Sequence, residues 1–362
     1  MPRVLMLSTD LERGGLPLRL VRLAERLRGT GIEPVVVCLT REGPLSKELR
    51  QGGIETFACD AGGRFDLSCL WRLARVVRRY APDVIHASLF HANIAARLTG
   101  RVDRPRPIIT SSVTIEIERA WHRWGEAATI GASDLHVANS RAVARHLVDE
   151  LGFPEHKVVV VPNGIDLGAI ERTAAIGRAE LGIDADTFLI VWAGRMDPVK
   201  DLATLVAAVE RFARTHKATA LLLGDGPERG RVVAMIRARG LGGVIRMAGW
   251  VECPAAYVKA ANCLLFPSRT EGSPNAVLEA MACGCPVVTS DIPACAELVR
   301  DGESGLLCRA GDADGFADAL LQTAARPVRA KVMAQAARAA AAGHDLGRVV
   351  RQWVDLYERV LG

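Results

Sequence analysis

Long hydrophobic runs are missing from this sequence. No apolar stretch approaches the roughly 20 residues that a membrane-spanning helix requires. The apolar run Val4 to Leu7 is followed at once by Ser8-Thr9-Asp10, so it is too short for the core of a signal peptide. From these two absences we expect a cytoplasmic protein.

Aromatic residues and patterned cysteines are scarce as well. Phe, Trp and Tyr make up 5% of the chain against 49% for all hydrophobic residues, so aliphatic side chains must fill the core. The 9 Cys are scattered, and no C-x-x-C pair is followed by a second one, which argues against structural zinc. The Asp-x-Asp pairs Asp184/Asp186 and Asp312/Asp314 precede expected helices and are interpreted as N-caps. We therefore expect no catalytic metal and no cofactor.

The sequence also lacks the dense basic stripe with interleaved aromatics that nucleic-acid-binding proteins carry, so no nucleic-acid partner is expected. Net charge is +5, and residues 1–170 hold 23 basic against 19 acidic residues. This excess favours anionic partners, either phosphates or an acidic membrane surface, with simple solubility as the alternative. Five arginines surround one expected helix of the first half, and the second, third and last of them share a face: Arg64, Arg72, Arg75, Arg78 and Arg79.

Short apolar strands alternate with helical stretches from end to end. This alternation predicts an α/β fold with mostly parallel sheets and helices on both faces. The rhythm restarts after the turn signal Pro162-Asn163-Gly164. We expect two Rossmann-like domains, 1–170 and 171–345, and a C-terminal helix, 346–362, that returns to the N-terminal domain. Strands are expected near 3–8, 33–39, 54–58, 83–87, 107–112, 133–138, 157–161, 187–193, 218–223, 244–247, 262–266, 286–289 and 305–308.

The most specific stretch runs from Glu271 through Gly272 to Asn275 and on to Glu279. A strand ends, a loop follows and a helix begins, with Ser273 as the expected N-cap and Pro274 as the first helical residue. Free N–H groups at such a helix start face the C-terminal edge of the sheet, where phosphates bind. Two glutamates there suit sugar hydroxyls, as an acidic residue does in dinucleotide-binding folds. The alternative is a cap carboxylate and a solvated helix residue.

A second stretch places Arg195 and Lys200 on the loop after strand 187–193. Two fixed cations at that edge hold a diphosphate and neutralise its charge as it leaves, unless they are merely solvated. Gly14-Gly15 follows the first strand and allows a ligand to approach the backbone closely.

Two histidines lie at the corresponding edge of the first domain. His86 ends a strand and His91 opens the next helix. A strand-end histidine is more often structural, but either side chain could reach a ligand there.

Taken together, these stretches resemble the retaining GT-B-fold glycosyltransferases of family 4 over nearly the whole chain. The resemblance rests on five motifs in the family's order: Gly14-Gly15, Val161 to Asp166, Gly194-Arg195 to Lys200, Gly224 to Pro227, and the E-x7-E pair Glu271/Glu279.

The resemblance implies two domains facing each other across a cleft. It implies that Arg195 and Lys200 grip the donor diphosphate, and that Glu279 binds the ribose. Glu271, with the backbone of 272–275, would hold the transferred sugar, and the base would lie against 249–251.

One departure concerns the loop after strand 107–112, where many members carry a histidine facing the donor sugar. This chain has Val113-Thr114 at that place. We expect His91 to take over part of the role; the alternatives are that Thr114 or Glu116 fills the gap, or that the site is impaired.

The expected function is therefore metal-independent, retaining transfer of a hexosyl or N-acetylhexosaminyl group. The donor is expected to be a UDP-sugar and the acceptor a glycan, a lipid-linked sugar or a small molecule, with peripheral membrane contact through the N-terminal domain. The alternatives are a non-catalytic nucleotide-sugar-binding protein and a nucleotide-sugar epimerase of the same fold.

Overall fold

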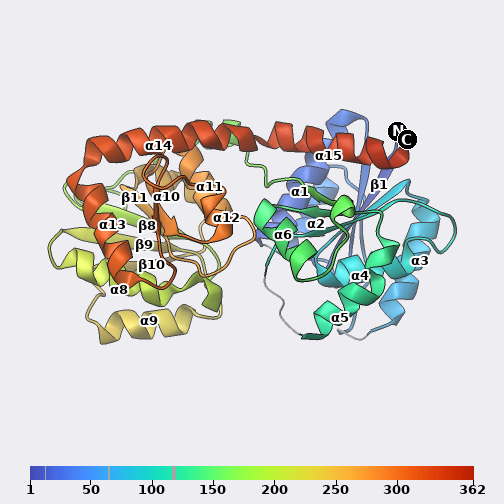
Figure 1. The fold of residues 1–362 in the computed structure, drawn as a ribbon, viewed down its shortest axis with the longest axis horizontal. Coiled ribbons are helices and arrows are strands. Elements are labelled where there is room, and N and C mark those ends of the chain that lie inside the picture. Colours follow the sequence, from blue (N-terminus) through green and yellow to red (C-terminus); the bar gives the residue numbers. More distant parts are fainter. Residues whose placement is uncertain (13, 64–65, 116–119) are drawn as a thin grey trace. The chain divides into compact units, whose positions relative to one another are not determined.

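The computed structural model describes residues 1–12, 14–63, 66–115 and 120–362. The chain forms two compact units, drawn in Figure 1. Unit 1 comprises residues 1–164 and 347–362, and unit 2 comprises residues 165–346. The chain therefore passes between the units twice.

Unit 1 is built on a seven-stranded parallel sheet with the strand order β3-β2-β1-β4-β5-β6-β7. Because crossovers between parallel strands are right-handed, α1 and α2 lie on one face and α3 to α6 on the other. Its strands are β1 (Arg3–Ser8), β2 (Glu33–Cys38), β3 (Thr56–Ala58), β4 (Val84–Ser88), β5 (Ile108–Ser112), β6 (Leu135–Ala138) and β7 (Val158–Val160). Its helices are α1 (Gly15–Leu27), α2 (Pro44–Gln51), α3 (Ser68–Tyr80), α4 (Phe90–Thr99), α5 (Ala120–Thr129), α6 (Arg141–Asp149) and α15 (Leu346–Leu361), with short turns η1 (Arg28–Thr30), η2 (Ile130–Ala132) and η3 (Glu155–Lys157).

Unit 2 repeats the design with a six-stranded parallel sheet of order β10-β9-β8-β11-β12-β13. Its strands are β8 (Phe188–Ala193), β9 (Ala218–Leu223), β10 (Ile245–Gly249), β11 (Cys263–Phe266), β12 (Val287–Ser290) and β13 (Leu306–Cys308). Its helices are α7 (Leu167–Arg172), α8 (Leu202–Ala213), α9 (Arg229–Ala238), α10 (Pro254–Ala260), α11 (Asn275–Ala282), α12 (Pro293–Ala296), α13 (Ala313–Ala325) and α14 (Pro327–Ala341), with turns η4 (Pro198–Lys200) and η5 (Ala342–His344). The predicted fold class, two parallel-sheet α/β units, is confirmed.

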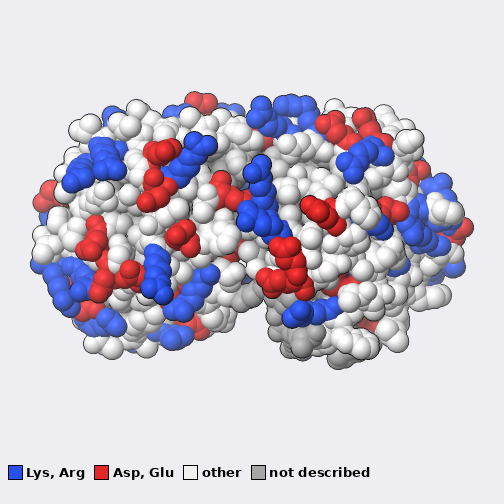
Figure 2. Space-filling model, in the orientation of Figure 1, with Lys and Arg blue, Asp and Glu red and all other residues white. Residues whose placement is uncertain are grey.

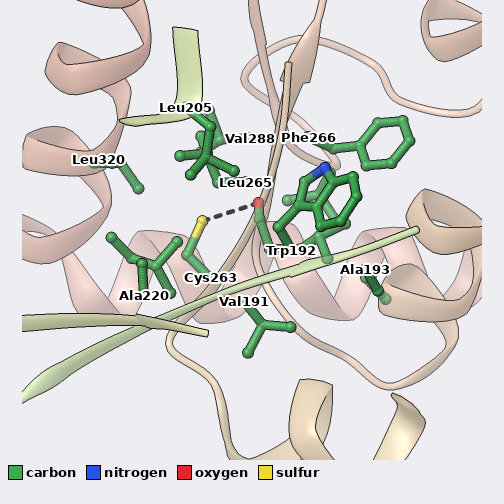
Figure 3. Close-up of a cluster of buried hydrophobic side chains, with 14 of the residues drawn as sticks. Val191, Trp192, Ala193, Leu205, Ala220, Cys263, Leu265, Phe266, Val288 and Leu320 are labelled. Carbon is green, nitrogen blue, oxygen red and sulfur yellow. Dashed lines mark hydrogen bonds between the residues drawn. The ribbon is translucent and has the colours of Figure 1, made fainter. Parts of the chain in front are cut away.

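The central strands of unit 2 are buried on both faces, which is why they appear as continuous apolar runs in the sequence. Figure 3 shows side chains from β8 and β11 packing beside Leu205 of α8 and Leu320 of α13, two helices that lie against each other on one face of the sheet. The largest of them is Trp192, which is fully buried. None of the helices in the described part of the chain has the length and apolar content needed to cross a bilayer.

One predicted detail of unit 2 is wrong. Asp184 and Asp186 do not cap a helix, because the next element is strand β8. Both carboxylates bind the ammonium of Lys217 instead, at 2.7 and 2.8 Å. Asp312, in contrast, caps α13 as expected by accepting the backbone N–H of Gly315.

Helix α15 completes the core of unit 1. Its apolar side packs on the sheet, and the ring of Trp353 stacks on His86 of β4 with centroids 4.3 Å apart. His86 Nδ1 lies 2.8 Å from the hydroxyl of Tyr357. His86 is thus a core residue beneath α15, which agrees with the structural interpretation and not with a ligand contact.

Burial lowers the pKa of His86 to about 3, and the nearby charge of Arg19 adds to this effect. The ordinary value is 6.5, so at mildly acidic pH the unfolded chain binds a proton that the folded chain rejects. The free energy of unfolding must therefore fall as pH drops below about 6.5, by up to ~1.4 kcal/mol per pH unit.

We predict that His86→Gln flattens this pH dependence by up to one proton between pH ~6 and ~4. Urea unfolding followed by circular dichroism measures the slope. The variant should be less stable at neutral pH, because it loses the ring stacked on Trp353. His156→Gln, at an exposed histidine, is the control and should leave the slope unchanged. Equal slopes for His86→Gln and wild type would contradict the assignment.

Candidate functional site

The strand order of unit 2 contains a switch point between β8 and β11. The chain runs from β8 outward to β9 and β10 and then returns to the other side of β8 as β11. The loops that follow β8 and β11 therefore diverge, and open parallel sheets bind ligands in the crevice between such loops. Both sequence-predicted donor stretches fall on these two loops.

The loop after β8 carries the predicted cations Arg195 and Lys200. Arg195 is mostly exposed, and its guanidinium lies 3.5 Å from the carboxylate of Asp197. Lys200 ends the short turn η4 and is largely buried, with its side chain 17% exposed. Its ammonium lies 5.5 Å from the ring centroid of Phe266, within reach of a weak cation–π attraction.

The loop after β11 leads into α11 through Glu271, Gly272, Ser273 and Pro274. The helix begins at Asn275, one residue later than predicted, with Pro274 in an extended conformation (φ −76°, ψ 101°) as its N-cap residue. The predicted N-cap role of Ser273 and the helical position of Pro274 are therefore wrong. Gly272 and Pro274 are buried, whereas Ser273 and Asn275 are half-buried.

Lys200 and Glu271 meet across the switch point. Lys200 Nζ donates to Glu271 Oε1 at 2.5 Å, and the glutamate side chain is 11% exposed. Charges this far from water require a partner, because a lone buried charge costs several kcal/mol. The ion pair thus holds both side chains in place at the crevice. Glu279 lies one turn beyond Asn275 on α11 and is half-buried.

A second ion pair joins the same two loops. Arg269 Nε donates to Asp201 Oδ2 at 2.9 Å, and the backbone N–H of Arg269 donates to the carbonyl of Val199 at 2.8 Å. Asp201 has φ +46°, which is rare for a residue other than glycine. Its carboxylate caps α8 by accepting the backbone N–H of Thr204 at 3.4 Å, and it also accepts the Thr204 hydroxyl at 2.8 Å. The sequence analysis did not single out Asp201 or Arg269. The only hint was that Asp201 follows Lys200 directly and that Arg269 lies close to Glu271 in the sequence.

The loop after β9 packs directly on the loop after β8. A Cβ on Gly224 would lie 1.9 Å from the carbonyl oxygen of Gly194, so only glycine fits there. The N–H of Gly224 donates to the carbonyl of Gly249 at 2.6 Å. The segment 249–251, expected to contact the base, therefore starts at the same sheet edge.

Unit 1 has its own switch point, between β1 and β4. Gly14 and Gly15 follow β1 and begin α1. A Cβ on Gly15 would meet no described atom within 4 Å, so packing within the described chain does not require glycine. The space above this backbone is open to a ligand.

His91 lies across the same switch point, as the second residue of α4. Its ring packs edge-on against Phe90 and Trp121. Just before the helix, Leu89 has φ +74°, a strained conformation for a bulky residue. Asn93 holds this turn, since its N–H donates to the carbonyl of Leu89 at 2.8 Å. Such strain costs on the order of 1–3 kcal/mol and clusters at functional sites. No sequence signal marks it.

The position where the histidine was missing is only partly described. Thr114 is exposed and lines a cavity of about 70 Å³ together with Phe90, His122 and Arg123. Glu116, the alternative to His91, lies outside the described residues. Within the residues that the structure describes, no group of three or more His, Cys, Asp or Glu side chains is placed to hold a metal ion.

Sequence comparisons identify relatives of both units. The family model described as "Glycosyltransferase Family 4" matches residues 13–169, and that described as "Glycosyl transferases group 1" matches residues 187–326. A lipopolysaccharide core biosynthesis glycosyltransferase of Rhizobium meliloti is 33% identical over 53% of this chain and 54% of its own length. A D-inositol 3-phosphate glycosyltransferase of Geodermatophilus obscurus is 32% identical over 68% and 55%. The chain spans about half the length of these two relatives. Another D-inositol 3-phosphate glycosyltransferase, from Kineococcus radiotolerans, is 28% identical over 97% of this chain and 91% of its own length.

Solved structures share the fold at lower identity. HepE of Anabaena, crystallised with UDP, superposes with a TM-score of 0.87 at 20% identity over 99% of this chain and 100% of that one. Sucrose-phosphate synthase of Thermosynechococcus elongatus gives 0.85 at 20% identity over 99% of each chain. With two matching family models and this fold, the chain belongs to the GT-B-fold glycosyltransferases of family 4.

Proposed function

We propose that this protein is a retaining glycosyltransferase that moves a sugar from a UDP-sugar to a lipid-linked glycan, without a metal ion, at the inner face of a membrane. The observation that carries the proposal is the ion pair of Lys200 with Glu271 at the switch point of unit 2. A cation and a carboxylate side by side suit a diphosphate and a sugar hydroxyl, respectively. UDP is favoured because HepE was crystallised with UDP-glucose, and a lipid-linked acceptor because one relative is named for lipopolysaccharide core synthesis.

In this proposal Lys200 and Arg195 bind the donor diphosphate. Lys200 is already positioned by Glu271, whereas Arg195 is exposed and must turn toward the ligand. Glu271 and the backbone of 272–275 hold the sugar, and Glu279 binds the ribose. The acceptor hydroxyl attacks the anomeric carbon on the face from which the diphosphate leaves. The C–O bond to the diphosphate breaks, and the hydroxyl proton passes to the departing phosphate oxygen. The protein supplies positioning and positive charge.

A thermal-shift screen tests the donor. UDP-sugars should raise the melting temperature, because a ligand that binds only the folded chain stabilises it. At a ligand concentration one hundred times Kd, the free energy of unfolding rises by ~2.7 kcal/mol. GDP- and ADP-sugars should have smaller effects. Release of UDP on addition of acceptor distinguishes a transferase from a non-catalytic binder, which shows the shift alone. An epimerase would convert the sugar without acceptor.

We predict that Lys200→Gln and Glu279→Gln each lower turnover at least ~100-fold, which corresponds to ~2.7 kcal/mol of transition-state stabilisation. At position 200 glutamine removes the positive charge, and at position 279 it removes the negative charge while keeping the size of the side chain. The assay contains EDTA throughout, and wild-type activity should be unaffected by it. Lys217→Gln is the matched control, because Lys217 pairs with Asp184 and Asp186 away from the switch point. Near-normal turnover for Lys200→Gln, or a strict need for Mg²⁺, would refute the assignment.

The Arg269–Asp201 pair is predicted to position Lys200 and Glu271. Arg269 is 63% exposed, so Arg269→Ala should change thermal stability little. It should nevertheless raise KM for the donor several-fold, because the two donor loops lose a link. Arg269→Lys should restore most of the loss. If Arg269→Ala and the exposed-site variant Arg300→Ala have the same KM, the pair has no positioning role.

His91 is proposed to contact the donor sugar in place of the missing histidine. Its ring lies in an aromatic cluster, so His91→Phe keeps the packing and removes only the imidazole nitrogens. We predict a loss of ~100-fold in turnover at saturating donor for His91→Phe. His122→Phe, in the same cluster, is the control and should lose much less. Thr114→Ala tests the alternative. A loss below ~3-fold for His91→Phe would leave the imidazole no catalytic role.

A further inference from the structure

Helices α3, α4 and α5 form one layer on the sheet of unit 1. The buried side of α3 shares a core with Ala92, Ala95 and Ala96 of α4. Helix α4 in turn packs on α5 through Phe90 and Trp121, and through the buried ion pair of Arg97 with Glu126. The outward side of this layer is therefore a continuous surface.

Large apolar side chains lie exposed on that surface. At the start of α3 they are its N-cap residue Leu67 and, four residues later, Trp71, which is 60% exposed. On α5 Trp124 is 81% exposed. Leu98 of α4 is also exposed, between them. Trp71 and Trp124, two of the 6 Trp of the chain, are thus exposed on one layer, and exposed apolar patches of this kind often mark interaction sites.

The charges on the same surface have one sign. Arg75 and Arg79 continue the stripe of Leu67 and Trp71 at four-residue spacing, with Arg78 beside them. The Arg75 guanidinium lies 4.7 Å from the Trp71 ring centroid. The three helices contain one acidic residue, Glu126, and it is buried.

No carboxylate in the described part of the chain pairs with these three arginines. Elsewhere, on the face drawn in Figure 2, acidic and basic residues are interspersed. Arg64, predicted to belong to this cluster, lies outside the described residues.

We propose that this surface, comprising Leu67, Trp71, Arg75, Arg78, Arg79 and Trp124, docks on an anionic lipid bilayer. Tryptophan side chains favour the boundary between headgroups and acyl chains, and arginines bind lipid phosphates. The residues extend over three adjacent helices, so α3 and α5 lie roughly 20 Å apart. A flat bilayer surface can contact residues this far apart at the same time, whereas a bound peptide would need a groove to lie in.

The proposal rests on the proposed function in one respect, the lipid-linked acceptor. The surface belongs to unit 1, whereas the proposed donor loops belong to unit 2. Loss of membrane docking should therefore leave donor binding intact, and the two proposals fail separately.

The first test is binding of the full chain to vesicles of one-third phosphatidylglycerol and two-thirds phosphatidylcholine, measured by flotation at low salt. We expect binding that weakens as salt is added, and little binding to phosphatidylcholine alone. The triple variant Arg75→Gln/Arg78→Gln/Arg79→Gln should bind roughly 100-fold more weakly, at about fivefold per arginine. The control removes three exposed arginines of α9 in unit 2, Arg229→Gln/Arg231→Gln/Arg237→Gln, and should bind as wild type does.

The second test removes the apolar contacts. Trp71→Ser/Trp124→Ser should weaken binding and make the remainder more sensitive to salt. Val328→Ser/Val332→Ser, two exposed valines of α14, is the matched control and should have no effect. The shift in melting temperature caused by UDP should be the same in all four variants.

Three results would overturn the proposal. The first is equal vesicle binding by the α3 and α9 arginine variants, which would mean that only net charge matters. The second is an absence of vesicle binding by the wild type. The third is concentration-dependent self-association that Trp71→Ser/Trp124→Ser abolishes, which would make the surface a contact between copies of the chain.

Discussion

The ion pair between Lys200 and Glu271 depends on the order of the parallel strands in unit 2, which places the loops after β8 and β11 side by side. At the switch point of unit 2, the loops after β8 and β11 leave the same sheet edge in different directions. The Lys200–Glu271 ion pair joins these two loops, and the Arg269–Asp201 ion pair joins them at a second point. The two ion pairs therefore fix the positions of these four side chains. Such fixed charges suit the proposed sugar transfer, since polar groups that need not reorganise act most strongly.

The sequence allowed the fold to be predicted well, for a physical reason. Strands buried on both faces must be apolar throughout, so β1, β2, β8 and β9 stand out from the polar loops around them. Amphipathic helices between them fix the parallel topology. The start of α11 was misplaced by one residue because Ser273 and Pro274 both suit a helix start. Only the backbone dihedrals of Pro274 show which of them lies outside the helix.

The site was predicted less completely. Motif spacing indicated Lys200 and Glu271 but not their contact, because 71 residues separate them. The strain at Leu89 had no sequence signal, since leucine normally avoids positive φ. The sequence left the role of His86 open because the residues that bury it, Trp353 and Tyr357, come from the far end of the chain. In each case a contact distant in sequence determines what the side chain does.

Helix α15 also has a consequence for synthesis. Residues 165–346 form unit 2 without interruption, so this unit can fold on the ribosome as it emerges. The sheet of unit 1 is made first but must wait for Trp353 and Tyr357 to cover His86. Until then the part of the sheet that α15 covers stays exposed to chaperones and to neighbouring nascent chains. The part of the protein that is translated first is thus the last to be finished.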